Sequence, residues 1–266
     1  MADLYQITGL QLSLPDMTRK PLFGPAPRVQ ILQGLDFTIP KGAVIGIVGG
    51  SGSGKSTLGR ALVRLLEPSG GAVRFGGIDI THKSDAELRP LRRRFQMIFQ
   101  DPMSSLNPRH RVGTIVAEPL RLHGFDAVAA RVARAFDQVG LPRDFVSRFP
   151  HELSGGQRQR IGIARAIALE PEFILADEIV SGLDVSSQAQ VLNLLENLVR
   201  DLGLTLAFIS HDLSVVRRLC ARVIVMQNGR IVENRETAAL FAAPQARYTR
   251  DLLDAIPLPD PDQVWA

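Results

Sequence analysis

Residues 49–57 read GGSGSGKST and match the pattern Gly-x-x-x-x-Gly-Lys-Ser/Thr. The apolar run that ends just before them, residues 43–48, contains valine and isoleucine and predicts a buried strand. Residues 57–66 place leucine and alanine at helical spacing and predict a helix. Strand, glycine-rich loop and helix in this order are typical of a phosphate-binding loop and disfavour an ordinary Gly/Ser-rich loop.

The residue types in this loop suit a nucleotide phosphate. Glycines allow consecutive backbone N–H groups to curl around an anion. The helix that follows directs its positive dipole end and its unpaired N–H groups to the same place. Lys55 adds a full charge for the β- and γ-phosphates, and the Ser56 hydroxyl is a suitable ligand for Mg²⁺.

Composition and charge are ordinary for a soluble globular protein of 266 residues, with 45% apolar and 22% charged residues. The net charge of +4 comes from 31 basic and 27 acidic residues. The only dense basic run covers Arg92, Arg93 and Arg94. Without an aromatic stacking platform it is more typical of a solvated face than of a nucleic-acid site, so we expect no nucleic-acid partner.

The single cysteine, Cys220, excludes an internal disulfide framework and a four-cysteine metal cluster. It lies in an apolar pattern and is expected to be a small core residue. The first residues, MADLYQ, lack the features of a signal peptide. No apolar stretch approaches the ~20 residues that span a bilayer. We therefore expect a cytosolic chain whose link to a membrane goes through partners.

The order of the predicted elements indicates an α/β fold with a mostly parallel sheet. Residues 5–14 and 31–39 alternate apolar and polar side chains around a proline-rich loop, which suggests an N-terminal antiparallel β subdomain. Two helical patterns, 112–122 and 127–139, suggest an inserted helical subdomain of about fifty residues. Further strands are expected at 72–75, 95–99, 173–176, 204–209, 223–226 and 230–232, and helices at 154–169, 185–200, 237–242 and 248–256.

These elements predict one domain over residues 1–266. Its parts are a core over 1–99 and 161–243, a helical subdomain over 100–160, and a C-terminal tail over 244–266. The last two strands flank Asn228-Gly229, a strong two-residue hairpin signal.

Two carboxylates follow the apolar strand 173–176, namely Asp177 and Glu178. Open α/β sheets bind ligands at the carboxyl ends of their strands. Asp177 therefore fits a Mg²⁺ ligand, and Glu178 could act as a base that polarises the attacking water. If the strand continued through 178, the two side chains would point to opposite faces. Ordinary surface carboxylates are the disfavoured alternative.

Gln100 and His211 also follow apolar strands and could reach the same edge. Gln100 could contact the metal or the water, and His211 the γ-phosphate. Either residue alone would more often be a plain loop residue.

A second candidate anion site lies in HELSGGQRQR, residues 151–160. Ser154 is a good N-cap, and Gly155 and Gly156 expose backbone N–H groups at a helix start. Nothing in the residues themselves indicates that this site adjoins the phosphate loop.

Together these motifs resemble the ATP-binding subunit of ABC transporters, over residues from about 5 to 256. The LSGGQ signature at 153–157 is specific to that superfamily. Segments 99–109, 117–120, 181–195 and 244–261 resemble the peptide/nickel/opine importer branch. The proline-rich loop before Ile31 and the absence of a cysteine-rich tail are similar to the second ATPase subunit of that branch.

The resemblance implies an ATPase that powers binding-protein-dependent import of a small solute at the cytoplasmic face of the inner or plasma membrane. Two ATPase subunits would face each other head to tail, as homodimer or heterodimer, and bind ATP and Mg²⁺ between the phosphate loop of one and the Ser154 helix start of the other. Two membrane permease subunits would dock near the Gln100 loop, and an external solute-binding protein would deliver the cargo.

The family's residue roles carry over to matching positions. Lys55, Gln100, Glu178 and His211 would be catalytic, and Ser56, Gln100 and Asp177 would hold Mg²⁺, while Asp184 would couple the two sites across the interface. The nucleotide would contact Gly49, Gly50, Ser51, Gly52, Ser53, Gly54, Lys55, Ser56, Thr57, Ser154, Gly155, Gly156, Gln157 and Asp184.

Two departures from the family pattern are visible. Ile179 stands where the family usually has proline, which leaves the local turn open. The aromatic that usually stacks on adenine is not identifiable in the sequence; Leu14 lies near its position and Phe23 is a weak substitute.

Two other functions remain open: a non-transport ABC ATPase, and a catalytically weak subunit of a heteromeric pair. Neither a second cassette nor a long insertion supports the former, and the intact Glu178 argues against the latter. The solute itself is not encoded in this chain's motifs.

Overall fold

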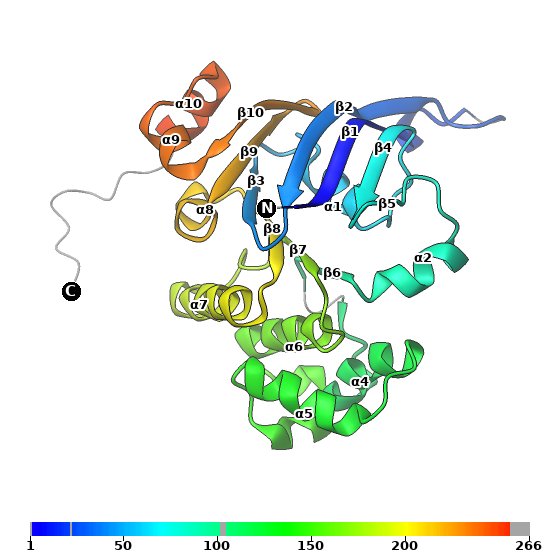
Figure 1. Ribbon diagram of the computed structural model, residues 1–266, viewed down its shortest axis with the longest axis vertical. Helices are drawn as coiled ribbons and strands as arrows, with labels where there is room; N and C mark the ends of the chain where they lie inside the picture. The colour runs from blue at the N-terminus through cyan, green and yellow to red at the C-terminus, as the bar shows by residue number, and fades with distance from the viewer. Residues whose placement is uncertain (1, 22, 102–104, 256–266) are drawn as a thin grey trace, which may run out of the picture.

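The computed structural model describes residues 2–21, 23–101 and 105–255. Its centre is a six-stranded sheet in the order β10-β9-β3-β8-β7-β6, in which all neighbours are parallel except the β10–β9 pair (Figure 1). The strands are β3 (Val44–Val48), β6 (Phe95–Ile98), β7 (Phe173–Asp177), β8 (Thr205–Ile209), β9 (Arg222–Gln227) and β10 (Arg230–Glu236).

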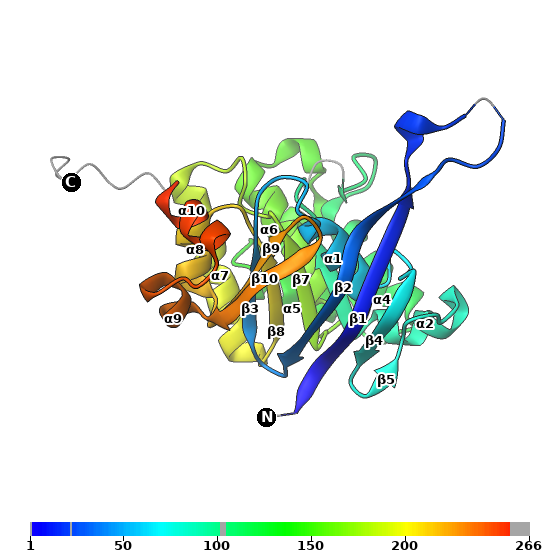
Figure 2. The same ribbon diagram turned by 90° about the horizontal axis from the view of Figure 1, so that it is seen from above.

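A second, antiparallel sheet covers one face of this centre, in the order β2-β1-β4-β5. Its long strands β1 and β2 run side by side and extend past the rest of the molecule (Figure 2). The strands are β1 (Asp3–Pro15), β2 (Arg28–Pro40), β4 (Gly70–Phe75) and β5 (Ile78–Asp79). The prolines between β1 and β2 leave a loop with one 3-10 turn, η1 (Met17–Arg19). These sheets confirm the predicted α/β class with an N-terminal antiparallel part.

Alternation along the central strands produces two hydrophobic cores. Phe173 and Leu175 of β7 face the antiparallel sheet and α1 (Lys55–Leu62), whereas Ile174 and Ala176 face the helices on the other side. Every β7 side chain is buried, so residues 173–176 form a continuous apolar run rather than an alternating one. Helix α1 approaches closely: a Cβ on Gly59 would lie 2.8 Å from Leu175.

The helices of the inserted segment lie at one end of the molecule, and the last two helices lie at the other (Figure 1). The inserted segment has α4 (Val112–Leu122), α5 (Val128–Gln138), the 3-10 turns η2 (Arg143–Ser147) and η3 (Pro150–Glu152), and α6 (Gly155–Ile167). The rest of the chain has α2 (Asp85–Arg92), α7 (Val185–Leu202), α8 (Leu213–Leu219), α9 (Thr237–Ala242) and α10 (Arg247–Asp254).

Most predicted helices and strands lie within a few residues of the observed ones, but among the described residues α2 and α8 are additional helices. Helix α2 starts at Ser84, whose side chain and that of Glu87 form a reciprocal capping box, a pattern visible in the sequence. Helix α8 starts at the Asp212 cap. Residue 160, the predicted end of the helical subdomain, lies inside α6. The predicted tail beyond residue 255 lies outside the described residues.

The basic run does more than face solvent. Arg92 donates to Asp85 at 2.7 Å, and Arg94 donates to Glu172 at 2.5 Å while its guanidinium lies over the ring of Phe75. The Arg92 contact therefore lies within α2, whereas Arg94 connects β4 to the start of β7. Cys220 is buried as predicted, and burial raises the pKa of its thiol.

Candidate functional site

The phosphate loop connects β3 to α1 and depends on glycine at three positive φ angles. Gly49, Gly52 and Gly54 have φ of 150°, 74° and 99°. A Cβ on Gly49 would lie 2.2 Å from the carbonyl oxygen of Met226, so no other residue fits there. Gly54 is the N-cap of α1 without any side-chain cap, and the first N–H groups of the helix face the loop.

Lys55 folds back over its own loop. Its buried Nζ donates to the carbonyl oxygens of Gly49 at 2.7 Å and Gly50 at 2.9 Å. Burial lowers the pKa of this ammonium, and the nearby carboxylates of Glu178 and Asp177 oppose that shift. The lysine is therefore a buried cation in the middle of the loop, held by two carbonyl oxygens.

Ser56 and Asp177 form the candidate metal site. The Ser56 hydroxyl donates to Oδ1 of Asp177 at 3.1 Å, although the two residues are far apart in sequence. Burial raises the pKa of the Asp177 carboxyl, and the Ser56 hydrogen bond opposes this shift. One hydroxyl and one buried carboxylate fit Mg²⁺, which binds few protein oxygens and completes its shell with phosphates and water. Within the described ranges no cluster of three His, Cys, Asp or Glu side chains could hold a metal.

Glu178 lies outside strand geometry, because β7 ends at Asp177 and Glu178 has φ of 49°. The opposite-face arrangement, which was conditional on a strand that continued through residue 178, therefore does not apply. Its carboxylate accepts from Nε2 of Gln100 at 3.2 Å and lies 3.6 Å from Nδ1 of His211. The fold thus brings together Gln100, Glu178 and His211 from the ends of β6, β7 and β8, as expected.

A cavity of about 310 Å³ lies over the phosphate loop. Residues 51–57 line it together with Glu178 and Ile31 of β2. Ile31 belongs to no sequence motif, so its place in the cavity lining is not predicted from the sequence. Strand β2 reaches the site only through the packing of the two sheets. A neighbouring cavity of about 330 Å³ is lined by Glu178, His211 and residues 180–183.

The second predicted anion site occupies the start of α6. The Ser154 hydroxyl accepts from the backbone N–H of Gln157 at 3.3 Å, and the Gln157 side chain accepts from the Ser154 N–H at 2.9 Å. Asp184 caps α7 in a similar way through Ser187, and these hydrogen bonds lower the pKa of its carboxyl. None of these residues lines the cavity over the phosphate loop.

The three doubtful positions have clear places in the structure. Ile179 is buried, 1% exposed, directly after the left-handed Glu178. Leu14 packs against the core between the two sheets, and Phe23 is 87% exposed in the loop between β1 and β2. Neither Leu14 nor Phe23 lines the cavity over the phosphate loop.

The β9–β10 turn supports the phosphate loop. Gly229, at φ of 74°, donates its N–H to the Ser53 carbonyl at 2.9 Å, and its own carbonyl accepts from Gln33 of β2 at 2.9 Å. A Cβ on Gly229 would lie 1.9 Å from the carbonyl oxygen of Ile31. The turn therefore holds the loop only if position 229 is glycine.

Gly229→Ala should lower the free energy of unfolding by about 2 kcal/mol or more, because it adds a backbone clash to the left-handed strain. Gly203→Ala is the matched control: Gly203 has φ of 62° with nothing within 4 Å of its Cβ, so it should cost only about 1 kcal/mol. Denaturant unfolding of both variants measures the difference. Equal costs would contradict the close packing of the turn on β2.

Comparisons with known proteins identify the family of this chain. The model for the family described as ABC transporter matches residues 32–181, more than half of the chain. The chain belongs to the ABC transporter family. The glycine loop, the Asp177-Glu178 pair and the SGG helix start are therefore parts of an ABC ATPase.

Curated relatives of this ABC ATPase include import proteins. A Brucella ovis protein named "Putative peptide import ATP-binding protein" is 55% identical over 237 residues, which are 88% of this chain and 75% of that protein. The glutathione import ATP-binding protein GsiA of Salmonella paratyphi A is 48% identical over 264 residues, 98% of this chain but 42% of that protein.

Solved ABC cassettes share the fold. One is a dimeric ATP-binding cassette in a post-hydrolysis state with ADP and Pi; it has a TM-score of 0.77 and 27% identity, and the match covers 88% of this chain and 98% of that one. Another is CbiO1 from Clostridium perfringens, part of an ABC transporter complex, with a TM-score of 0.78 and 27% identity over 91% of this chain and 92% of that one.

Proposed function

We propose that this ABC ATPase hydrolyses ATP to drive import of a small peptide-like solute, as one of two ATPase subunits that face each other head to tail. The observation that carries the proposal is the separation of two anion-binding helix starts. The phosphate loop has its own cavity, and the Ser154 helix start, whose first turn holds Gly155 and Gly156, does not line that cavity. A partner's nucleotide would use the N–H groups of this helix start.

Within one composite site, the residues divide the work. Residues 49–57, with Lys55 among them, would bind the phosphates, and Ser56, Asp177 and Gln100 would hold Mg²⁺, which would neutralise charge on the β- and γ-phosphates. Glu178 accepts a proton from the attacking water. The Gln100 contact and the nearby His211 keep its carboxylate at the edge of the sheet, so the base is held before ATP arrives.

The contacts of Glu178 favour a catalytically active subunit over a weak one. The Glu178 carboxylate is 20% exposed and lies between the Gln100 amide and the His211 imidazole. A catalytically weak subunit would not require a carboxylate in this arrangement. The non-transport alternative has less support, since the relatives described above carry import names. Asp184 and the Ser154 helix start would both contact the partner subunit at the interface. Asp184 is also the N-cap of α7, so α7 would begin at that interface.

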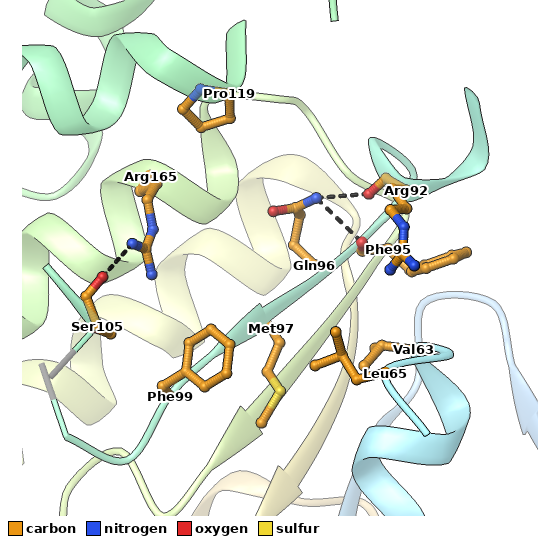
Figure 3. A pocket seen from close by; sticks show the side chains of 10 residues that line it. All are labelled: Val63, Leu65, Arg92, Phe95, Gln96, Met97, Phe99, Ser105, Pro119 and Arg165. Carbon is orange, nitrogen blue, oxygen red and sulfur yellow. Dashed lines mark hydrogen bonds between the residues drawn. The ribbon is translucent and has the colours of Figure 1, made fainter. Parts of the chain in front are cut away.

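A groove of about 500 Å³, lined in part by Phe99, suits a membrane subunit (Figure 3). It runs along β6, the edge strand of the central sheet, towards α4 and α6. Phe99 and Leu65 in its lining are 38% and 48% exposed, and Arg165 donates to the Ser105 carbonyl at 2.6 Å. Such exposed apolar side chains favour a protein partner. We propose that a cytoplasmic segment of each permease subunit docks here.

The subunit would therefore sit on the cytoplasmic face of the membrane, attached through the permease subunits. Among the described helices none has the length and apolar character to cross a bilayer. The names of the relatives point to oligopeptides or glutathione-like solutes, while the external solute-binding protein and the permease would choose the cargo.

The test compares ATP hydrolysis per subunit in two states: the dilute isolated chain, and the chain reconstituted in vesicles with its permease subunits, a partner ATPase and the binding protein. We expect hydrolysis to be at least about tenfold faster in the assembly, because each site lacks half of its ligands in the monomer. Peptide-loaded binding protein should stimulate it further. Equal activity of the dilute monomer would contradict the composite site.

A further inference from the structure

The C-terminal helix contacts the phosphate loop directly. The hydroxyl oxygen of Tyr248, on α10, accepts a hydrogen bond from the backbone N–H of Gly50 at 2.8 Å. The two residues are 198 positions apart in the chain. Tyr248 is half-buried, and its ring packs against the core beside the central sheet.

This contact holds one particular peptide group. The N–H that Tyr248 binds and the Gly49 carbonyl belong to the same peptide plane, and that carbonyl accepts from Nζ of Lys55 at 2.7 Å. Tyr248 therefore fixes one end of the plane while Lys55 binds the other. Because both flanking residues are glycine, no Cβ resists rotation of this plane, and its orientation depends on these two hydrogen bonds.

The start of helix α10 is bound to β10. The carboxylate of Glu233, whose side chain is 3% exposed, accepts from the N–H groups of Gln245 at 3.0 Å and Ala246 at 3.1 Å, just before α10 starts. Thr249, the residue after Tyr248, is buried. The hydroxyl of Tyr248 is thus placed by a helix whose start is bound to Glu233 and whose residue Thr249 is buried.

We propose that Tyr248 is a positioning residue for nucleotide binding: it holds the Gly49–Gly50 peptide plane in the orientation that preorganises the phosphate loop and its lysine. Its hydroxyl acts through the loop and contacts no reacting atom. When ATP arrives, Lys55 leaves the Gly49 carbonyl for the phosphates, and Tyr248 alone then keeps the plane from turning. The inference rests on the proposed role of the phosphate loop.

Tyr248→Phe tests this role, because it keeps the ring and removes only the hydroxyl. We expect the Kd of MgATP and of MgADP, measured by calorimetry, to rise about three- to tenfold, up to the net value of one hydrogen bond. In the reconstituted transporter KM for ATP should rise by the same factor, while kcat changes less than about twofold. A Kd that stays the same or falls overturns the inference.

The chain's other tyrosine is the matched control. Tyr5 is fully buried and donates to the Leu62 carbonyl at 3.1 Å, away from the phosphate loop. Tyr5→Phe should lower the unfolding temperature and leave the Kd of nucleotide unchanged. Tyr248→Phe should raise the Kd of nucleotide and leave the unfolding temperature nearly unchanged. If Tyr5→Phe weakens binding as much as Tyr248→Phe, loss of general stability explains the effect and the inference is wrong.

Two further variants separate possible failures. Glu233→Gln should weaken nucleotide binding in the same direction, and combining it with Tyr248→Phe should add little, because both act through α10. Fully additive effects would overturn the route through the helix. If Lys55→Ala retains ATP, the proposed nucleotide site itself is wrong; if Lys55→Ala loses ATP and Tyr248→Phe binds normally, only the inference fails.

Discussion

Glu178→Gln should reduce ATP hydrolysis by the reconstituted transporter about 10²- to 10⁴-fold while ATP still binds. The amide keeps the size of the side chain and its contact with Gln100, but it cannot accept the proton of the attacking water. With hydrolysis blocked, ATP should remain between the two subunits and hold them together. Size-exclusion chromatography in MgATP should therefore show a stable dimer that the unmodified subunit does not accumulate.

Glu172→Gln is the control for this prediction. Glu172 precedes the same strand and pairs with Arg94 at 2.5 Å, so the substitution removes a carboxylate from the same region without touching the site. It should leave hydrolysis within about twofold of the unmodified chain, since part-exposed ion pairs are worth little. Unchanged hydrolysis in Glu178→Gln would remove Glu178 from the role of base.

Lys55→Ala should weaken ATP binding at least about 100-fold, because the ammonium makes more than one charge-assisted hydrogen bond to phosphate. Its Nζ already reaches two carbonyl oxygens of the loop in the absence of nucleotide. The lysine is buried, and burial lowers the pKa of its ammonium, so removing it should not destabilise the empty protein. Calorimetric titration with MgATP measures the first effect and thermal unfolding the second.

Lys41→Ala serves as the matched control for charge, because Lys41 is exposed in the turn between β2 and β3. It should change the Kd for MgATP by less than about twofold, the value of an exposed charge screened by solvent. Normal binding by Lys55→Ala would contradict the assignment of residues 49–57 as the phosphate loop.

Much of the site could be read from local patterns because its chemistry is local. The phosphate loop is one contiguous stretch whose glycines, lysine and serine act through their own backbone and side chains. Asp177, Gln100 and His211 could be placed at one edge because each follows an apolar strand, and parallel strands end at the same side of a sheet. The capping box of the α6 helix start is likewise written within four residues.

What patterns could not give were the contacts between distant segments. Ile31 and the Gly229 turn reach the phosphate loop because β2 crosses beside the β9–β10 hairpin, a consequence of how two sheets pack. The left-handed backbone at Glu178 was also not predicted. The usual sequence signal for a turn after the strand is a proline, and the buried Ile179 stands in its place. Tertiary packing decides both.

By itself the amino-acid sequence indicated the family, the order of most strands and helices, and the candidate residues for phosphate and metal binding, since hydrophobic period and short motifs carry those properties. Only the tertiary structure decided that Glu178 lies between Gln100 and His211 and that the Tyr248 hydroxyl accepts a hydrogen bond from the Gly50 N–H of the phosphate loop. A single hydrogen bond across 198 residues leaves no period or motif behind, because it depends on where two folded elements meet rather than on either element alone.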